Sequence, residues 1–152
     1  MRIIVTGTPG TGKTVAAKAI AKQLRYPYLS LKKFTKDYNL RESYDKERKT
    51  YEVDTNKLVK ELKKFLKNKK DIVIDGHLSH YLPKSYVDLC VVTKCSLKTL
   101  QQRLKKRRYS KAKIRENLDA EIFDVCLTEA KERGHKVKVI DTDKKYQHRL
   151  QI

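Results

Sequence analysis

A glycine-rich segment near the start of the chain constrains the fold more than any other feature. Residues 7–14 read Gly-Thr-Pro-Gly-Thr-Gly-Lys-Thr. The apolar, β-branched run at residues 2–6 comes directly before it and predicts a buried strand. Ala16, Ile20 and Leu24 follow at four-residue spacing and predict a helix with one apolar stripe. The sequence therefore predicts a strand, a tight glycine loop and a helix in direct succession.

The glycine segment fits the pattern G-x-x-x-x-G-K-[ST] of a phosphate-binding loop, or P-loop. Gly10 and Gly12 let backbone N–H groups curl around a phosphate, and the helix start adds the positive end of its dipole. Lys13 is predicted to reach the β- and γ-phosphates, and Thr14 to place its hydroxyl on Mg²⁺. The alternative is a chance glycine turn, but all four fixed positions and both flanking elements match. The loop indicates a nucleoside triphosphate such as ATP, without specifying the reaction.

The rest of the chain alternates strand-like and helical patterns. Strand-like runs lie at 26–31, 72–74, 87–92 and 137–140; helical stripes are formed by Leu58, Leu62, Phe65 and Leu66, by Leu97, Leu100 and Leu104, and by Ile114, Leu118, Ile122 and Val125. Because we find no short hairpin turns, this alternation predicts a five-stranded parallel sheet with right-handed crossovers. The expected fold is an α/β three-layer sandwich of the P-loop NTPase type, in one domain. The polar stretch 32–53 lacks a clear period and is interpreted as a mobile insert.

Asp75 and His77 follow the predicted strand at 72–74. Ligands of open parallel sheets bind beyond the carboxyl ends of the strands, so Asp75 is expected to meet the magnesium, directly or through water. The alternative for Asp75 is a residue that only forms the turn. His77 lies close enough to orient water or a phosphate oxygen, although a single histidine is usually structural. His80 has no third ligand in register with His77, and we therefore expect no zinc site here.

A strongly basic segment follows the run at 87–92. Residues 94–115 contain ten Lys or Arg and no Asp or Glu. Arg103 and Arg107 are four residues apart and share a helix face, where two guanidinium groups are able to clamp nucleotide phosphates. The alternative is a solvated surface, which carries more weight for the lysines than for Arg107 because arginine suits bidentate phosphate contacts.

Composition limits the cellular setting and the partners. The chain of 152 residues carries 37 Lys and Arg against 18 Asp and Glu, a formal net charge of +19, which favours polyanionic partners such as RNA or nucleotides. Its three cysteines, Cys90, Cys95 and Cys126, form no CxxC pair, so we expect a reducing compartment. We find no membrane-spanning run and no signal peptide. A soluble, cytoplasmic protein is expected.

With these residues in place, the chain resembles the adenylate kinase isoenzyme 6 family, small nucleoside monophosphate (NMP) kinases also known as coilin-interacting nuclear ATPases. The resemblance spans nearly the whole chain and is most specific after the loop. It rests on residues 7–14, Tyr44-Asp45, Asp54, Asp75-x-His77, Pro83, Arg103-Leu104, Arg107-x-Tyr109 and Asn117-Leu118-x-x-Glu121-Ile122-Phe123. The short, basic form is similar to archaeal members.

The resemblance implies a monomeric enzyme that moves the terminal phosphoryl group of ATP to AMP or a related monophosphate, with ATPase activity beside it. It also implies a role in maturation of the small ribosomal subunit, with a ribosomal protein and its 16S rRNA as partners. On the family pattern an insert at about 30–53 receives the monophosphate and residues at about 106–116 form a lid. Arg107 falls at the lid arginine, Lys144 at a late ATP contact, and His77 in a catalytic Asp-x-His motif.

Two departures from the family pattern bear on substrate choice and lid movement. Lys32-Lys33 stand where members carry Gly-Asp, and Arg108 stands where glycine is usual after the lid arginine. Two alternatives to a monophosphate kinase remain. One is an assembly factor whose grip on rRNA or a ribosomal protein is switched by ATP, a reading that the net charge favours. The other is a different small P-loop kinase, although sugar- and shikimate-recognition signatures are missing.

Overall fold

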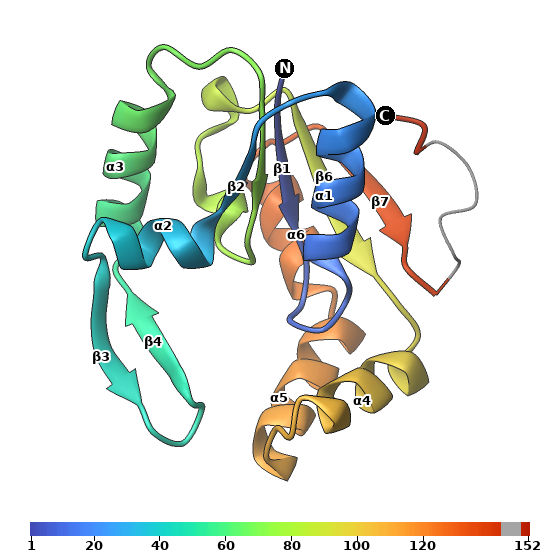
Figure 1. Cartoon of the computed structure of the whole chain (residues 1–152). Coiled ribbons are helices and arrows are strands. Elements are labelled where there is room, and N and C mark those ends of the chain that lie inside the picture. Colours follow the sequence, from blue (N-terminus) through green and yellow to red (C-terminus); the bar gives the residue numbers. More distant parts are fainter. Residues whose placement is uncertain (144–149) are drawn as a thin grey trace.

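The computed structural model describes residues 1–143 and 150–152 and has an α/β architecture (Figure 1). Its strands are β1 (Arg2–Thr6), β2 (Tyr28–Ser30), β3 (Arg41–Asp45), β4 (Thr50–Val53), β5 (Ile72–Asp75), β6 (Leu89–Lys94) and β7 (Val137–Asp141). Its α-helices are α1 (Lys13–Leu24), α2 (Leu31–Asp37), α3 (Thr55–Leu66), α4 (Leu97–Lys106), α5 (Lys111–Ile122) and α6 (Val125–Glu132). In the described ranges no helix has both the length and the apolarity to cross a membrane.

Five parallel strands form the central sheet, in the order β2-β5-β1-β6-β7. This confirms the predicted five-stranded parallel sheet. The first strand of the chain lies in the middle, so the loop after β1 leaves the sheet between β5 and β6. Since all five strands run the same way, their carboxyl ends share one edge, and the glycine loop and Asp75 both lie there.

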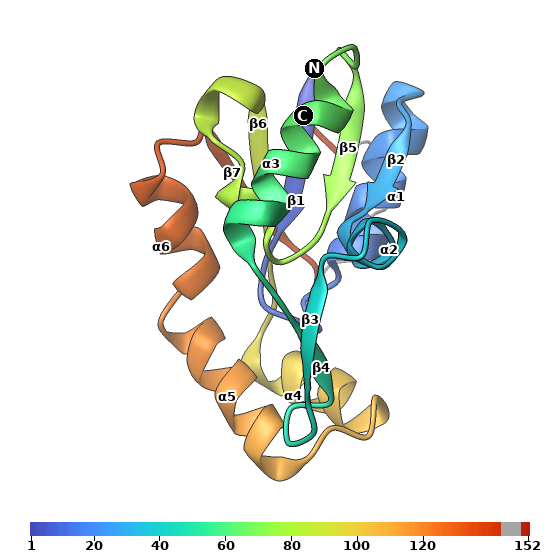
Figure 2. The same ribbon diagram turned by 90° about the vertical axis from the view of Figure 1, so that its left-hand side faces the viewer.

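Two apolar cores cover the two faces of the sheet. One contains Leu58, Leu62 and Leu66 of α3, together with Ala130 of α6. The other contains the alanine and isoleucine stripe of α1. Figure 2 shows α3 and α6 on the same side of the sheet, with α1 behind it. Helices therefore cover both faces, and the three-layer sandwich predicted from the sequence is confirmed.

The prediction of no hairpin turn was wrong. Strands β3 and β4 pair antiparallel as a separate two-stranded sheet within the polar stretch 32–53, which also contains all of α2 except its first residue. The side chain of Asp45 accepts hydrogen bonds from the backbone N–H groups of Glu47 and Arg48, which builds the turn without glycine or proline. Because most residues of both strands are exposed, their sequence shows no apolar alternation.

The single helix predicted from the stripe Ile114 to Val125 is two helices. α5 ends at Ile122, and Asp124 takes the left-handed conformation with φ 52° before α6 begins. The side chain of Asp124 pairs with the ammonium group of Lys94 at the end of β6. This contact fixes the break between α5 and α6 at the edge of the sheet. The spacing of apolar residues does not reveal such a break, because it depends on a contact with a distant strand.

Candidate active site

The loop between β1 and α1 is fixed by contacts that require glycine. A Cβ atom on Gly7 would lie 2.7 Å from the carbonyl oxygen of Thr93, and one on Gly10 would lie 2.9 Å from side-chain carbons of both Leu100 and Leu104. Gly10 and Gly12 have φ values of 93° and 92°, a region that side chains disfavour. Within the loop, the N–H and hydroxyl of Thr11 both donate to the carbonyl of Thr8, at 3.1 and 2.7 Å. The sheet edge and α4 thus hold the loop in the curled form that the sequence predicted.

Lys13 lies in the first turn of α1 and its ammonium group returns to the loop. Its Nζ donates to the carbonyl oxygen of Thr8 at 3.2 Å. Desolvation lowers the pKa of Lys13 to about 8, although the nearby carboxylate of Asp75 acts in the opposite direction. A phosphate at the loop would supply the negative charge that this half-buried cation lacks.

The next side chain along α1 meets the end of β5. The hydroxyl of Thr14 donates to Oδ2 of Asp75 at 2.7 Å, and the hydroxyl of Tyr28 on β2 donates to the same oxygen at 2.8 Å. Asp75 is buried, and desolvation with the Asp75 hydrogen bond raises the pKa of Tyr28 to about 12. A hydroxyl and a carboxylate are hard oxygen donors of the kind that Mg²⁺ prefers, and Mg²⁺ commonly takes only one or two protein ligands beside water and phosphate. The residues therefore fit the magnesium role predicted for Thr14 and Asp75.

His77 lies at the same sheet edge, two residues beyond Asp75. Its side chain is exposed to solvent, yet desolvation by surrounding protein atoms, with repulsion from Lys13 and His80, lowers its pKa to about 4. The ring is therefore neutral at pH 7. The backbone around it is held by Thr6, whose hydroxyl lies 3.2 Å from the carbonyl of His77 and 2.8 Å from Nδ1 of His80. His80 itself is buried and pairs with Glu129 at 2.6 Å, so its role is structural.

The two predicted arginines lie on the other side of the loop. A pocket of about 410 Å³ is lined by Gly10, Gly12, Val15, Arg103, Lys106, Arg107 and Thr142. The guanidinium of Arg103 donates to the carbonyl of Gly10 at 3.3 Å and to the hydroxyl and carbonyl of Thr142, both at 3.1 Å. Arg103 therefore ties the loop to the segment after β7. Arg107, at the end of α4, is exposed, and contact of either arginine with phosphate remains a prediction.

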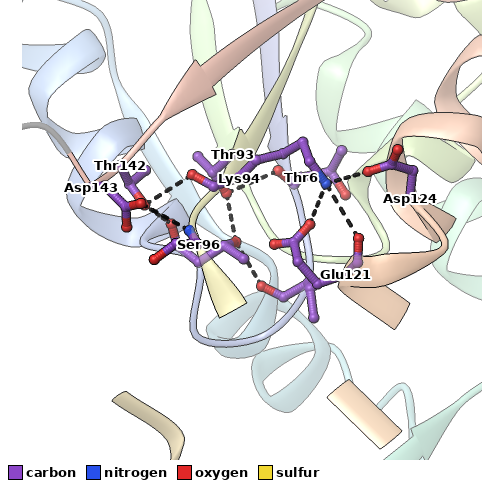
Figure 3. A network of polar contacts seen from close by, with 10 residues as sticks. Thr6, Thr93, Lys94, Ser96, Glu121, Asp124, Thr142 and Asp143 are labelled. Carbon is purple, nitrogen blue, oxygen red and sulfur yellow. Dashed lines mark hydrogen bonds and ion pairs between the residues drawn. The ribbon is translucent and has the colours of Figure 1, made fainter. Parts of the chain in front are cut away.

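A polar network links this side of the site to α5. Figure 3 shows the ammonium group of Lys94 between the carboxylates of Glu121 and Asp124, with Thr93, Thr142 and Asp143 nearby. The hydroxyl of Thr142 donates to the carbonyl of Thr11 at 2.6 Å. The network joins the ends of β6 and β7 to the loop and to the helix that carries the predicted lid residues.

Sequence reasoning missed Tyr28 and Thr142. Thr142 directly follows β7, which is the signal that selected Asp75, whereas Tyr28 begins β2 and reaches Asp75 through its long side chain. The predicted ATP contact Lys144 lies outside the described residues. The other predicted residues gather at one edge: Gly10, Gly12, Lys13, Thr14, Asp75 and Arg103 are joined by the contacts above, and Arg107 and His77 lie beside them.

The lowered pKa of Lys13 predicts pH-dependent nucleotide binding. In EDTA, the charge of bound ATP will raise the pKa of Lys13, so binding above pH 8 takes up a proton. The affinity for ATP therefore falls as pH rises through the pKa of Lys13 in the nucleotide-free protein, about 8. The loss is about tenfold between pH 7 and pH 9. Isothermal titration calorimetry at both pH values measures this loss. The Lys13→Arg variant keeps its charge and should not show it; equal slopes in the two proteins would contradict the assignment.

The backbone conformation of Arg108 explains why members of the family carry glycine at this position. Its φ is 58°, so it takes the left-handed conformation where glycine is favoured. We expect Arg108→Gly to leave the free energy of unfolding unchanged within about 0.5 kcal/mol, because relief of strain offsets the added freedom of the unfolded chain. Gln101→Gly, at an exposed position in the middle of α4, should cost about 1 kcal/mol. Urea denaturation of the two variants compares the costs, and equal losses would contradict this explanation.

A glycine loop that begins a helix, a lysine directed back into it, and a Thr–Asp pair at the neighbouring strand end define the nucleotide site of a P-loop protein. Sequence comparison agrees: the family described as "AAA domain" matches residues 3–124. The "Putative adenylate kinase" of Pyrococcus abyssi is 41% identical over 95% of this chain and 77% of its own length. "Adenylate kinase isoenzyme 6 homolog FAP7" of Saccharomyces cerevisiae is 40% identical over 94% of this chain and 74% of its own. The chain belongs to the adenylate kinase isoenzyme 6 family.

Solved structures with much lower identity share the fold. A shikimate kinase from Acinetobacter baumannii matches with a TM-score of 0.64 at 15% identity, covering 95% of this chain and 84% of that chain. The deoxyadenosine kinase of M. mycoides with bound dATP matches with a TM-score of 0.61 at 17% identity, covering 97% and 94%. These similarities confirm the P-loop kinase fold, and the sequence relatives support a nucleotide kinase.

Proposed function

We propose that this nucleotide kinase transfers the terminal phosphoryl group of ATP to AMP or a related nucleoside monophosphate. The observation that carries the proposal is the bond between Thr14 and Asp75, which sets a carboxylate and a hydroxyl beside the P-loop lysine. The proposal also draws on the names of the relatives, which are adenylate kinases. In the reaction a phosphate oxygen of AMP attacks the γ-phosphorus of ATP, the bond from that phosphorus to the β–γ bridging oxygen breaks, and two ADP molecules leave.

Each residue has a role that follows from its position. Backbone N–H groups of the loop hold the β-phosphate. The ammonium group of Lys13 stabilises the negative charge that spreads over the γ-phosphoryl oxygens during transfer. Thr14 and Asp75 would hold Mg²⁺, which neutralises phosphate charge when bound. His77, neutral at pH 7, is suited to accept or donate one hydrogen bond to a phosphate or water, and Arg107 is suited to stabilise the transferring group.

Two arms flank the site in this proposal. The hairpin of β3 and β4 belongs to the insert at 30–53 that would receive the monophosphate, and residues 106–116 would form the lid. Arg48 at the hairpin turn forms an ion pair with Glu116 on α5, with 3.1 Å between Nη2 and Oε1, so the two arms are in contact. Closure of both arms would exclude water and favour AMP as acceptor. Incomplete exclusion would leave the ATPase activity that the family resemblance implies.

An assay across acceptors tests the proposal. Purified protein is incubated with Mg-ATP and AMP, CMP, GMP or UMP, and nucleotides are separated by chromatography. We expect two ADP per ATP consumed with AMP, and a slower release of phosphate without an acceptor. Acceptor-independent hydrolysis alone would overturn the kinase assignment and leave an ATPase.

A nucleotide-switched assembly factor for the small ribosomal subunit is the second candidate. The net charge of +19 favours it, because a strongly basic protein binds rRNA and its complexes. This function predicts that affinity for small-subunit rRNA or for a ribosomal protein differs between the ATP-bound and ADP-bound protein. Equal affinity in both states, measured by fluorescence anisotropy, would overturn it without affecting the kinase proposal.

A further inference from the structure

A groove lies on the α3 side of the sheet, apart from the P-loop. It has a volume of about 620 Å³ and is lined by Thr55, Asn56, Val59, Lys60, Lys63, Lys64, Tyr81 and Arg133. Six of these residues come from α3, Tyr81 comes from the short 3-10 helix after β5 (Ser79–Tyr81), and Arg133 follows α6. The two helices stand on one face of the sheet, as Figure 2 shows. None of the candidate active-site residues lines this groove.

The groove is strongly cationic. Its lining includes four Lys or Arg side chains and no Asp or Glu. Lys60, Lys63 and Lys64 recur at three- and four-residue spacing and therefore share one face of α3. Of the four cations only Lys64 forms an ion pair within residues 1–143 and 150–152, with Glu61 at 2.9 Å. The positive charge of Lys60, Lys63 and Arg133 is left for an anionic ligand.

Aromatic side chains lie in and beside the groove. Tyr81 belongs to the lining, and the guanidinium of Arg133 lies over its ring, 4.0 Å from the centroid. Tyr86 lies beside the groove, with Nζ of Lys63 5.4 Å from the centroid of its ring. Both tyrosines are half-buried. The carboxylates of an acidic peptide would pair with the lysine and arginine side chains but would leave the tyrosine rings without a stacking partner. Phosphates with neighbouring bases use both, because bases stack on tyrosine rings and guanidinium planes.

We propose that this groove binds single-stranded nucleic acid, with the α3 lysines on the phosphates and a base stacked at Arg133 and Tyr81. Unpaired bases are free to stack on such side chains, whereas the bases of a duplex are already stacked on one another, which favours a single strand. The proposal does not depend on the kinase reaction, since the two sites share no residue.

Fluorescence anisotropy of the full chain with a labelled 12-nucleotide RNA tests the proposal, with DNA of the same sequence as a second probe. In Lys60→Glu/Lys63→Glu we expect at least tenfold weaker binding at 0.1 M salt. The loss of two phosphate contacts should also lower the slope of log affinity against log salt by about 1.4. Tyr81→Ala should weaken binding by roughly fivefold or more, through lost stacking. AMP-dependent ADP formation should not change in either variant.

The matched control is Lys22→Glu/Lys98→Glu, which makes the same change in net charge at exposed positions of α1 and α4. We expect at most a threefold loss in this control. Equal losses in the two double variants would show that only net charge matters and would overturn the proposal. Tighter binding of a duplex, or full competition by poly-glutamate without an effect of Tyr81→Ala, would also overturn it. A preference between RNA and DNA identifies which single strand the groove takes.

Discussion

Replacing Lys13 with alanine is expected to lower AMP-dependent ADP formation by about 10³-fold while the protein stays folded. The ammonium group lies beside the loop that would hold the β- and γ-phosphates, with Thr8 as its hydrogen-bond acceptor. Charge aimed at a transferring phosphoryl group counts most in the transition state, and loss of one such donor commonly costs 10²- to 10³-fold. The effect should therefore fall mainly on kcat.

The fold should tolerate this change. Burial of the charged form of Lys13 is unfavourable, as its lowered pKa shows, so removing the charge does not remove a stabilising ion pair. We expect a melting temperature close to that of the unchanged protein. Lys22→Ala, at an exposed position of the same helix, serves as control and should keep full activity. If Lys13→Ala remains within tenfold of full activity, phosphoryl transfer does not occur at this loop.

The middle of the central sheet was predictable because β1, β5 and β6 are buried on both faces. The residues of β5 and the inner residues of β1 and β6 are buried, so these strands read as continuous apolar runs. The loop and Asp75 were predictable for a related reason. Ligands of a parallel sheet bind beyond the carboxyl ends of its strands, so the binding residues directly follow the apolar runs that form those strands. Such residues can be found from the sequence alone.

The hairpin and the break between α5 and α6 were not predictable from periodicity. β3 and β4 bury little, so no apolar pattern selects a register, and the turn depends on one aspartate side chain. The helix break depends on Asp124 meeting Lys94, which is thirty residues away in the chain. Both features are set by tertiary or side-chain contacts that spacing rules do not contain.

Tyr28 shows the same limit at the site. β2 is only three residues long and half-buried, so its sequence signal is weak. Its position becomes informative only through pairing with β5, which sets Ser30 opposite Asp75 and brings the Tyr28 hydroxyl to that carboxylate. To find a side chain on a neighbouring strand that contacts Asp75, one must know the strand order, which the sequence alone did not provide.

The Asp75→Asn variant is expected to lose about 10²- to 10³-fold in kcat and to require more Mg²⁺ for half-maximal activity. The amide has the shape of the carboxylate and its oxygen still accepts from Thr14 or Tyr28, so the fold should remain. It lacks the negative charge that attracts a hard cation. A Mg²⁺ titration of ADP formation at saturating ATP measures both effects, with Asp37→Asn at the exposed end of α2 as control.

Tyr28→Phe separates the charge of Asp75 from its positioning. This variant removes one hydrogen bond to Oδ2 and leaves the carboxylate of Asp75 in place, so we expect only a roughly twofold to tenfold loss in kcat and an unchanged Mg²⁺ requirement. If Asp75 acted only as a turn-forming residue, Asp75→Asn and Tyr28→Phe would change the melting temperature and leave the Mg²⁺ dependence alone. A shifted Mg²⁺ requirement in Asp75→Asn but not in Tyr28→Phe is the result that a metal-binding carboxylate demands, because only the first substitution removes the charge.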